Sequence, residues 1–295
     1  MGNEALALGK RVRLSRMVNP ESNKMMAITV DHAISRGIAQ LTGIHDIQGT
    51  IDKIVAGHPD AITMTGGIQK RCWGKHAGSG ISILHKISNY APTSPTNDIV
   101  FGSVNAAIRM GADAVSLGAM TLGDFQNEQF KEIGEISEVC DVLGMPLIGH
   151  IYPKGESVPA DKRTAWENIA YCVRSACELG LDVIKTTYTG DPESMAKVIS
   201  VVPSSFRVVI QGGDPPAELT GEKRLEYYLT MTREALDSGV GGVTMGRWVW
   251  EYQDVTALVI ALRRLIHKNY SVKETMELLK QVEHDKNYED YQSLT

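Results

Sequence analysis

A lysine closes a run of apolar residues in the segment DVIKTTYTGD, residues 182–191. Val183 and Ile184 have the composition of an interior strand, and Lys185 stands where that strand would meet its loop. A lysine amine becomes a nucleophile when desolvation or a neighbouring cation lowers its pKa, and it can then form a Schiff base with a carbonyl compound. The resulting iminium withdraws electrons from the adjacent carbon–carbon bond, which permits aldol cleavage or condensation without a metal. The alternative is a lysine whose ammonium reaches out to water.

Three further residues could move or position protons beside such a lysine. Ile148, His150 and Tyr152 alternate onto one face of a predicted strand. A tyrosine hydroxyl can carry a proton to and from a substrate hydroxyl, and His150 could assist from the same face. Asp31 ends another predicted strand and could orient a substrate hydroxyl or assist proton transfer near Lys185. The alternatives are a packed aromatic ring for Tyr152 and a helix cap or loop hydrogen bond for Asp31.

Two glycine sites follow the last two predicted strands and are typical of phosphate binding. Gly212 and Gly213 occur in the sequence QGGD, and Gly246 precedes Arg247 in MGRW. Glycine lets a phosphate approach the backbone N–H groups closely, and an arginine adds charge-assisted hydrogen bonds. A single Gly-Gly pair more often marks a turn. Two glycine sites after consecutive strands, which would be neighbours in a barrel, favour an anion site.

Histidines near strand ends offer an alternative to lysine chemistry. His32, His85 and His150 could be ligands of a divalent metal in a lyase or hydrolase, which needs three ligands and an open coordination position. They form no H-x-H or H-x-x-x-H pair, so their spacing does not favour a metal site, and His32 is grouped instead with the substrate-binding residues. Lys86 is a rival nucleophile, a substrate-binding cation, or a cation that lowers the pKa of Lys185.

The elements that would position these residues alternate along the chain. Short runs rich in Val, Ile and Thr, bounded by Gly, Pro and Asp, predict eight strands, and most are followed by helical periodicity. The predicted strands are 25–30, 60–65, 81–87, 113–118, 146–151, 182–187, 207–211 and 242–246. The alternation predicts a closed parallel (β/α)8 barrel, with a doubly wound open sheet as the alternative. Active sites of such barrels collect at the carboxyl ends of the strands, where the candidate residues stand.

The predicted barrel is a single domain over 1–295, because no linker or shift in composition divides the chain. Residues 1–24 are expected to form an N-terminal extension, and residues 268–295 a C-terminal helix with a tail that is either an interface arm or disordered. The segment 66–80 is rich in glycine and predicts a long loop over one end of the barrel.

Several helix ends carry recognisable signals. Thr164 with Glu167, and Ser271 with Glu274, have the spacing of a capping box. Asp191 precedes a proline and predicts the N-cap of another helix, which favours a structural rather than a catalytic carboxylate.

Composition narrows the classes of function. Hydrophobic residues make up 43% and charged residues 22% of 295 residues, values typical of a soluble globular enzyme. The net charge of −5, without a basic block, does not support nucleic-acid binding. No segment has the length and apolarity of a signal peptide or membrane span, and the four cysteines form no C-x-x-C pair, so we expect a cytoplasmic protein without membrane partners.

Together, several stretches resemble the DhnA-type class I aldolases of the DeoC/LacD superfamily, which include the archaeal-type fructose-bisphosphate aldolases. The resemblance runs over roughly residues 13–251. It is carried by VDHAISRG (30–37), PLIGHIYPKG (146–155), DVIKTTYTGD (182–191), and VVIQGGD (208–214) with GVTMGRWVWE (242–251).

The resemblance implies a (β/α)8 barrel and a Schiff-base mechanism that uses neither metal nor other cofactor. It implies that Lys185 forms the iminium, that Tyr152 carries the proton and that Asp31 is the carboxylate of the site. It implies a substrate phosphate bound at Gly212, Gly213, Gly246 and Arg247. It also implies a homo-oligomer, for which a decamer is one candidate form.

Two positions depart from the family pattern. Ala33 stands where the family often has glycine, and His150 stands where sugar-bisphosphate members often have an apolar or aromatic residue. Similar motifs occur in relatives that transfer keto-sugar fragments, as transaldolases do, and in the thiolase that processes phosphorylated autoinducer-2. We therefore expect a class I aldolase acting on a phosphorylated ketose or keto compound. An acyl or ketol transferase using the same lysine, a metal-dependent lyase, and a non-catalytic sugar-phosphate binder are the alternatives.

Overall fold

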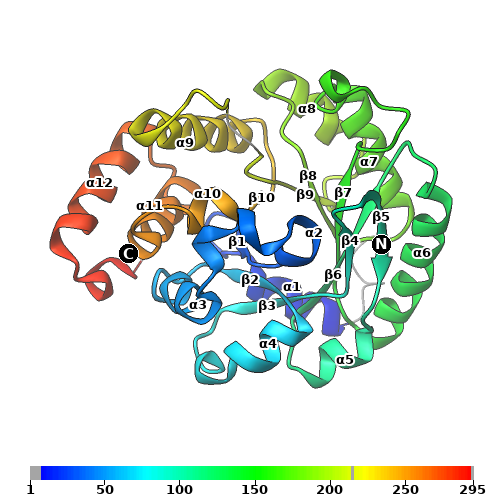
Figure 1. The fold of residues 1–295 in the computed structure, drawn as a ribbon, viewed down its shortest axis with the longest axis horizontal. Coiled ribbons are helices and arrows are strands. Elements are labelled where there is room, and N and C mark those ends of the chain that lie inside the picture. The colour runs from blue at the N-terminus through cyan, green and yellow to red at the C-terminus, as the bar shows by residue number, and fades with distance from the viewer. Residues whose placement is uncertain (1–7, 214–215, 294–295) are drawn as a thin grey trace.

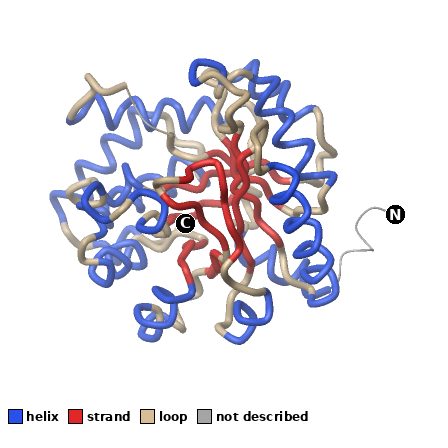
Figure 2. Tube along the Cα trace, turned by 45° about the vertical axis from the view of Figure 1, so that its right-hand side comes forward, coloured by secondary structure: helices blue, strands red, loops and turns tan. Residues whose placement is uncertain are grey.

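The computed structural model describes residues 8–213 and 216–293. Ten strands lie in this part of the chain. They are β1 (Met25–Thr29), β2 (Ala61–Thr65), β3 (Ser82–Lys86), β4 (Ser88–Ala91), β5 (Ser94–Val100), β6 (Ala114–Met120), β7 (Leu147–Tyr152), β8 (Val183–Thr186), β9 (Arg207–Ile210) and β10 (Gly242–Met245). Eight of them close a parallel barrel in the order β1-β10-β9-β8-β7-β6-β3-β2, with helices outside it (Figures 1 and 2).

The predicted single (β/α)8 barrel is confirmed, and each of the eight predicted strands overlaps a strand of the barrel. The barrel closes because β1 pairs in parallel with both β2 and β10: Ile28 is opposite Ile62 on one side and Met245 on the other. This closure excludes the open doubly wound sheet. The strands are rich in Val, Ile and Thr because a parallel strand in a barrel is buried on both faces.

Helices follow the strands and cover the barrel from outside (Figure 1). The α-helices are α1 (Leu8–Met17), α2 (Ala33–Arg36), α3 (Ile47–Ala56), α4 (Gly66–Cys72), α5 (Val104–Arg109), α6 (Gln126–Leu143), α7 (Trp166–Glu178), α8 (Pro192–Ser200), α9 (Gly221–Asp237), α10 (Arg247–Trp250), α11 (Val255–His267) and α12 (Val272–Asp285). Short 3-10 helices are η1 (Ile38–Gln40), η2 (Thr42–Ile44), η3 (Gly74–His76), η4 (Ala160–Lys162) and η5 (Tyr288–Tyr291). Within the described residues, no helix is both long and apolar enough to cross a bilayer.

Helix α1 covers the end of the barrel where the strands begin. Met17 is fully buried and packs with inward-facing residues of the lowest barrel layer, among them Leu84, Ile148 and Val183. Lys10 is also buried and forms ion pairs with Asp141 at 2.5 Å and with Asp182 at 2.9 Å. The bottom of the barrel is therefore packed and closed, and the other end remains for substrate.

Two predictions about connecting segments are corrected. The segment 66–80, expected as a loop, contains α4 and η3, because Gln69 and Cys72 are buried at helical spacing while the glycines stand at the ends of the two helices. The hairpin of β4 and β5 was not predicted. Its sequence, with Pro92 and Pro95, has the composition of a connection rather than of a strand.

The predicted helix ends are mostly present. Asp191 caps α8 by accepting a hydrogen bond from Ser194 N, and the capping box of Ser271 and Glu274 is complete at the start of α12. The box expected at Thr164 is wrong: α7 begins after Ala165, whose N–H bonds the carbonyl of the preceding 3-10 helix η4. That turn places Thr164 one residue too early to cap the helix.

The C-terminal segment folds against the barrel helices. Helix α12 packs on α9 and α11 at the outer edge of the molecule (Figure 1). Beyond it, Tyr288 Oη bonds the Asp254 carboxylate, and Gln292 Nε2 donates to the carbonyl of Ala56 at 3.0 Å. The tail up to residue 293 is therefore held by the barrel rather than disordered; its expected role as an interface arm stays a prediction.

Candidate active site

Lys185 lies near the carboxyl end of β8 and faces a small polar cavity at the open end of the barrel, here called the mouth pocket. Its volume is about 70 Å³. It is lined by Asp31, His32, Ser35, Arg36, Lys86, Asn89, Tyr90, Asp98, Met120, His150, Tyr152, Lys154, Lys185 and Gln211. All four predicted catalytic residues, and the predicted ligands His32 and Lys86, thus line one cavity.

Strand pairing explains how residues far apart in sequence meet there. His150 on β7 is opposite Lys185 on β8, so both side chains point inward in the same layer. Ile148, two residues earlier, lies in the packed layer below, and Tyr152, two residues later, lies at the rim. The alternation expected for β7 therefore places His150 and Tyr152 inside the barrel.

The environment of Lys185 favours a neutral amine. The side chain is only 6% exposed. Burial lowers the pKa of Lys185 to about 8; Asp31 opposes this shift, whereas Lys86 and Lys154 add to it. At pH 7 roughly a tenth of the amine is then unprotonated, far more than for an ordinary lysine, and this is the form that acts as a nucleophile. The role of Lys86 as a cation that lowers the pKa of Lys185 is consistent with this arrangement.

Tyr152 is held as a protonated phenol. Its side chain is buried, and burial raises its pKa well above the usual value, with Asp31 and Asp98 adding to the rise. Lys154 Nζ lies 5.1 Å from the centre of its ring. The hydroxyl can therefore give a proton to an alkoxide that forms beside Lys185.

Asp31 and His32 follow β1, with Val30 between the strand and Asp31. Helix α2 begins after His32 and has no side-chain cap, so Asp31 does not have the capping role considered for it. Asp31 Oδ1 lies 3.6 Å from His32 Nδ1. Burial lowers the pKa of His32 to about 4, and burial likewise lowers the pKa of His150 well below its usual value. Both imidazoles are therefore neutral at physiological pH.

The histidines considered as metal ligands do not form a cluster. His85 points away from the mouth pocket, because its Nδ1 lies 2.6 Å from Gln69 Oε1 of helix α4. Among the described residues, no group of three or more His, Cys, Asp or Glu side chains is arranged to hold a metal ion. His32 and His150 remain in the mouth pocket beside the lysines.

The predicted phosphate residues fall into two places. Gly212 and Gly213 line a second cavity of about 750 Å³, here called the rim cavity, over the ends of β7, β8 and β9. Lys154 and Gln211 border both the rim cavity and the mouth pocket, so the two are neighbours. Gly213 has φ of +62°, a conformation that favours glycine.

Gly246 and Arg247 line neither the rim cavity nor the mouth pocket, and they lie beside His32. A Cβ atom at Gly246 would lie 2.5 Å from His32 Cε1, so glycine is required for His32 to pack there. Arg247 is half-buried and contributes to the low pKa of His32, after burial. The glycines at 246 and 212 are thus explained by side-chain packing, since a Cβ atom at Gly212 would lie 2.2 Å from Trp248 Nε1, whereas Gly213 faces open space.

Sequence reasoning missed several residues of the mouth pocket. Arg36 and Gln211 lie inside the quoted motifs, next to residues that were selected, and could have been found by reading each motif to its end. Asn89 and Asp98 come from the unpredicted hairpin of β4 and β5. Nothing in the local sequence of that hairpin shows that it bends over the barrel.

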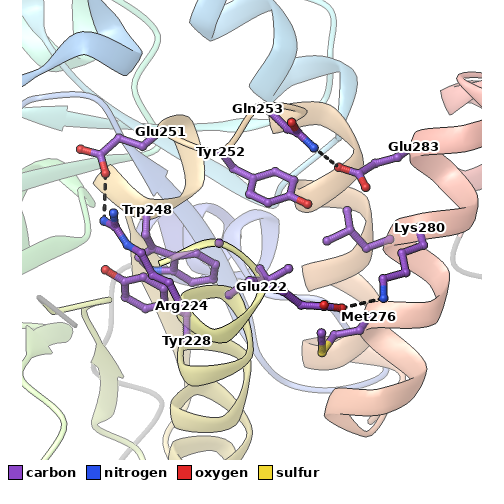
Figure 3. Close-up of a pocket in the computed structure, with 13 residues that line it drawn as sticks. Glu222, Arg224, Tyr228, Trp248, Glu251, Tyr252, Gln253, Met276, Lys280 and Glu283 are labelled. Atoms are coloured by element: carbon purple, nitrogen blue, oxygen red, sulfur yellow. Dashed lines mark hydrogen bonds and ion pairs between the residues drawn. The ribbon is translucent and has the colours of Figure 1, made fainter. Parts of the chain in front are cut away.

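A third cavity, here called the outer cavity, lies outside the barrel between α9, α10 and α12, with a volume of about 460 Å³ (Figure 3). Tyr228 and Trp248 stack in its wall with ring centres 4.3 Å apart. Its charged groups face one another across the opening, as Lys280 and Glu222 do at 2.6 Å. No predicted catalytic residue lines this cavity.

Comparisons with known proteins show the family to which the chain belongs. The model of the DeoC/LacD family aldolases matches residues 25–252. The 2-amino-3,7-dideoxy-D-threo-hept-6-ulosonate synthase of Halobacterium salinarum is 31% identical over 259 residues, which cover 88% of this chain and 92% of that protein. The 2-amino-4,5-dihydroxy-6-oxo-7-(phosphonooxy)heptanoate synthase of Streptomyces griseus is 28% identical, covering 88% and 91%.

A solved structure described as the Schiff base forming fructose-1,6-bisphosphate aldolase superposes with a TM-score of 0.77 at 25% identity, covering 87% of this chain and 99% of that one. The family match extends over all eight strands of the barrel. The chain belongs to the DeoC/LacD family of aldolases and has the barrel fold of the Schiff-base-forming members.

Proposed function

We propose that this protein is a class I aldolase that cleaves or condenses a phosphorylated ketose or related keto compound through a Schiff base on Lys185. One observation carries the proposal: a buried lysine with a pKa of about 8 faces the same small pocket as Tyr152 and Asp31. Membership of an aldolase family supports it. The fold alone would not, because barrels of this kind host many unrelated reactions.

The residues have distinct roles in the proposed condensation. The neutral amine of Lys185 attacks the ketone carbon, and the carbinolamine loses water to give an iminium. Asp31 accepts a proton from the adjacent carbon, which leaves an enamine. That carbon attacks the aldehyde carbonyl, the new carbon–carbon bond forms, and Tyr152 protonates the resulting alkoxide. Water then hydrolyses the iminium and releases Lys185, and a proton passes from Asp31 to Tyr152. Cleavage is the reverse sequence.

The phosphate is proposed to orient the ketone beside Lys185. Backbone N–H groups at Gly212 and Gly213 would face it, and Arg247 beyond Gly246 would add positive charge. Fixing one end of the substrate places its carbonyl within reach of the amine and removes much of the entropic cost of the encounter. His32 and Lys86 are proposed as further substrate contacts, because both line the mouth pocket.

A second candidate uses the same lysine in a synthase or ketol-transfer reaction. Two relatives are named as synthases of seven-carbon keto acids that carry an amino group, and one of these names includes a phosphonooxy group. His150, a polar residue beside Lys185, would suit a pocket for such an acceptor. This candidate and a sugar-phosphate aldolase share the lysine chemistry. They differ in the acceptor, the compound that the enamine attacks.

Hydrogen exchange at the substrate carbon tests the proposal. Incubation with dihydroxyacetone phosphate in D₂O, followed by proton NMR, should show loss of one carbon-bound hydrogen through the enamine. The exchange should persist with excess EDTA. Exchange that stops with EDTA would indicate a metal-dependent lyase instead. If a panel of phosphorylated ketones binds but none exchanges, the protein is a non-catalytic sugar-phosphate binder.

A further inference from the structure

Asp98 reaches the mouth pocket from outside the barrel strands. It lies on β5, in the hairpin with β4 that packs beside β6 (Figure 1). A Cβ atom at Gly118 on β6 would lie 2.2 Å from Asp98 Oδ2. The carboxylate therefore occupies the volume that an inward side chain at position 118 would fill, which explains the glycine.

Strand register places this carboxylate in the layer of the proposed catalytic residues. Gly118 is opposite His150 on β7, and His150 is opposite Lys185 on β8. Asp98 is 4% exposed and lines the mouth pocket together with Lys185. The hairpin thus adds to this layer a carboxylate that no barrel strand provides.

The hydrogen bonding of Asp98 is incomplete. The Gly118 N–H donates to Ser88 Oγ at 2.7 Å, and both groups lie close enough to lower the pKa of Asp98, but Asp98 Oδ1 is buried and has no hydrogen-bond partner among the described residues. Burial raises the pKa of Asp98, which Lys86 opposes. A buried carboxylate oxygen without a donor costs free energy, and such atoms are rare unless they serve a function. The arrangement suits a donor group on a bound substrate.

The order of the strands around the barrel indicates which part of the substrate would carry the donor group that faces Asp98. The proposed phosphate residues follow β9 and β10, the lysine is on β8, Tyr152 is on β7, and Asp98 lies over β6. A substrate with its phosphate over β9 and its carbonyl at Lys185 therefore extends past Tyr152 towards Asp98. Tyr152 protonates the alkoxide to give the new hydroxyl group. In the aldol product, the carbons beyond that hydroxyl come from the aldehyde.

We propose that Asp98 determines acceptor specificity by accepting a hydrogen bond from a hydroxyl or ammonium group on the aldehyde-derived half, one carbon beyond the new hydroxyl. Asp98 makes and breaks no covalent bond in this role. The inference rests on the proposed function and adds a substrate class to it: aldehydes with a donor group on the carbon next to the carbonyl.

Three matched aldehydes test the inference, with dihydroxyacetone phosphate as the ketone. 2-Hydroxypropanal, 2-aminopropanal and propanal differ only in the group at the second carbon. Wild type should prefer one of the first two over propanal in kcat/KM, and Asp98→Ala should reduce that preference about 10- to 100-fold, the effect of losing a hydrogen bond to a charged group. The aldehyde that loses its advantage in the variant shows whether Asp98 binds a hydroxyl or an ammonium group. Unchanged preferences would overturn the inference.

Two variants check that the effect comes from the carboxylate. Gly118→Ala should displace Asp98 and reduce the same preference, and the double variant with Asp98→Ala should be no worse than either single variant, because the methyl group then has room. Thr96→Val, on the same hairpin but bonded to Glu156 on its outer side, should keep the preference. If the double variant loses as much of the aldehyde preference as the two single variants together, Asp98 does not act from the space next to Gly118.

Borohydride separates failure of this inference from failure of the proposed function. Both wild type and Asp98→Ala should form a reduced adduct with dihydroxyacetone phosphate on Lys185, because Asp98 contacts the other half of the substrate. An adduct in both proteins with unchanged acceptor preferences would sink only the role of Asp98. Absence of an adduct in wild type would refute the Schiff-base function and this inference together.

Discussion

The mouth pocket and the outer cavity differ in how their charges are compensated. In the outer cavity, Arg224 pairs with Glu251 at 3.1 Å and Lys280 with Glu222 at 2.6 Å, as Figure 3 shows. In the mouth pocket, by contrast, charges of both signs surround the buried Lys185: burial lowers its pKa, Asp31 opposes this shift, and Lys86 and Lys154 add to it.

For locating the functional site, this difference in charge is more informative than the volume of the two cavities. The outer cavity, at about 460 Å³, is several times larger than the mouth pocket, at about 70 Å³. Yet the paired charges of the outer cavity are exposed to water, whereas Lys185 in the mouth pocket is buried and has a lowered pKa. Groups with perturbed pKa values in a cleft are characteristic of functional sites. The variants below test this contrast between the two regions.

Loss of the Lys185 amine should have the largest effect on activity. Lys185→Met should lower kcat/KM by about 10⁴-fold or more, because no other group in the site would form the covalent intermediate. The measurement is turnover of whichever phosphorylated ketone shows hydrogen exchange, with circular dichroism to establish that the barrel is intact. A variant that retained a tenth of the activity would place the nucleophile elsewhere, with Lys86 the first candidate.

Tyr152→Phe should have the next largest effect. Removing the hydroxyl leaves the ring and its packing but removes the proposed proton donor, so turnover should fall about 10²- to 10⁴-fold. Adduct formation with borohydride should fall much less, since the imine forms before the proton step. Equal losses in both measurements would mean that Tyr152 acts on Lys185 rather than on the substrate hydroxyl.

The pH dependence of imine formation should follow the pKa of Lys185. The rate should rise with pH through about 8 and then level off, because only the neutral amine attacks. Lys86→Met removes a neighbouring cation, stabilises the protonated amine and should move this midpoint upward by about one unit. Single-turnover trapping across pH gives both midpoints. A downward shift in the variant would contradict the electrostatic account of the pocket.

The smallest effect is expected in the outer cavity. Lys280→Met breaks the ion pair with Glu222, which is exposed on both sides and contributes little to stability. Neither kcat/KM nor the midpoint of thermal unfolding should change measurably. The variant matches Lys185→Met in chemistry, so a clear loss of activity here would remove the distinction between the two cavities.

The barrel and the centre of its site could be predicted because both depend on local sequence. Each strand is a short apolar run, and a residue at the end of such a run must stand at the open end of the barrel. Lys185, Tyr152 and Asp31 follow from that rule, and alternation along β7 adds His150.

Contacts between distant segments explain what was missed. Asp98 enters the site because a hairpin folds over β6 and because position 118 is a glycine, a pairing that neither stretch shows by itself. The segment 66–80 was misassigned because its glycines outweighed two buried positions, Gln69 and Cys72, whose partners lie elsewhere in the fold. Gly246 was assigned to phosphate binding, while its nearest neighbour is the ring of His32.

Borohydride trapping with peptide mapping tests the central claim most directly. The protein is incubated with dihydroxyacetone phosphate, fructose 1,6-bisphosphate and a panel of other phosphorylated ketones, each with borohydride, and the modified peptide is identified by mass. We predict a reduced adduct on Lys185, formed faster as pH rises through about 8 and absent in Lys185→Met. An adduct on Lys86, or binding of every ketone without any adduct, would contradict the account.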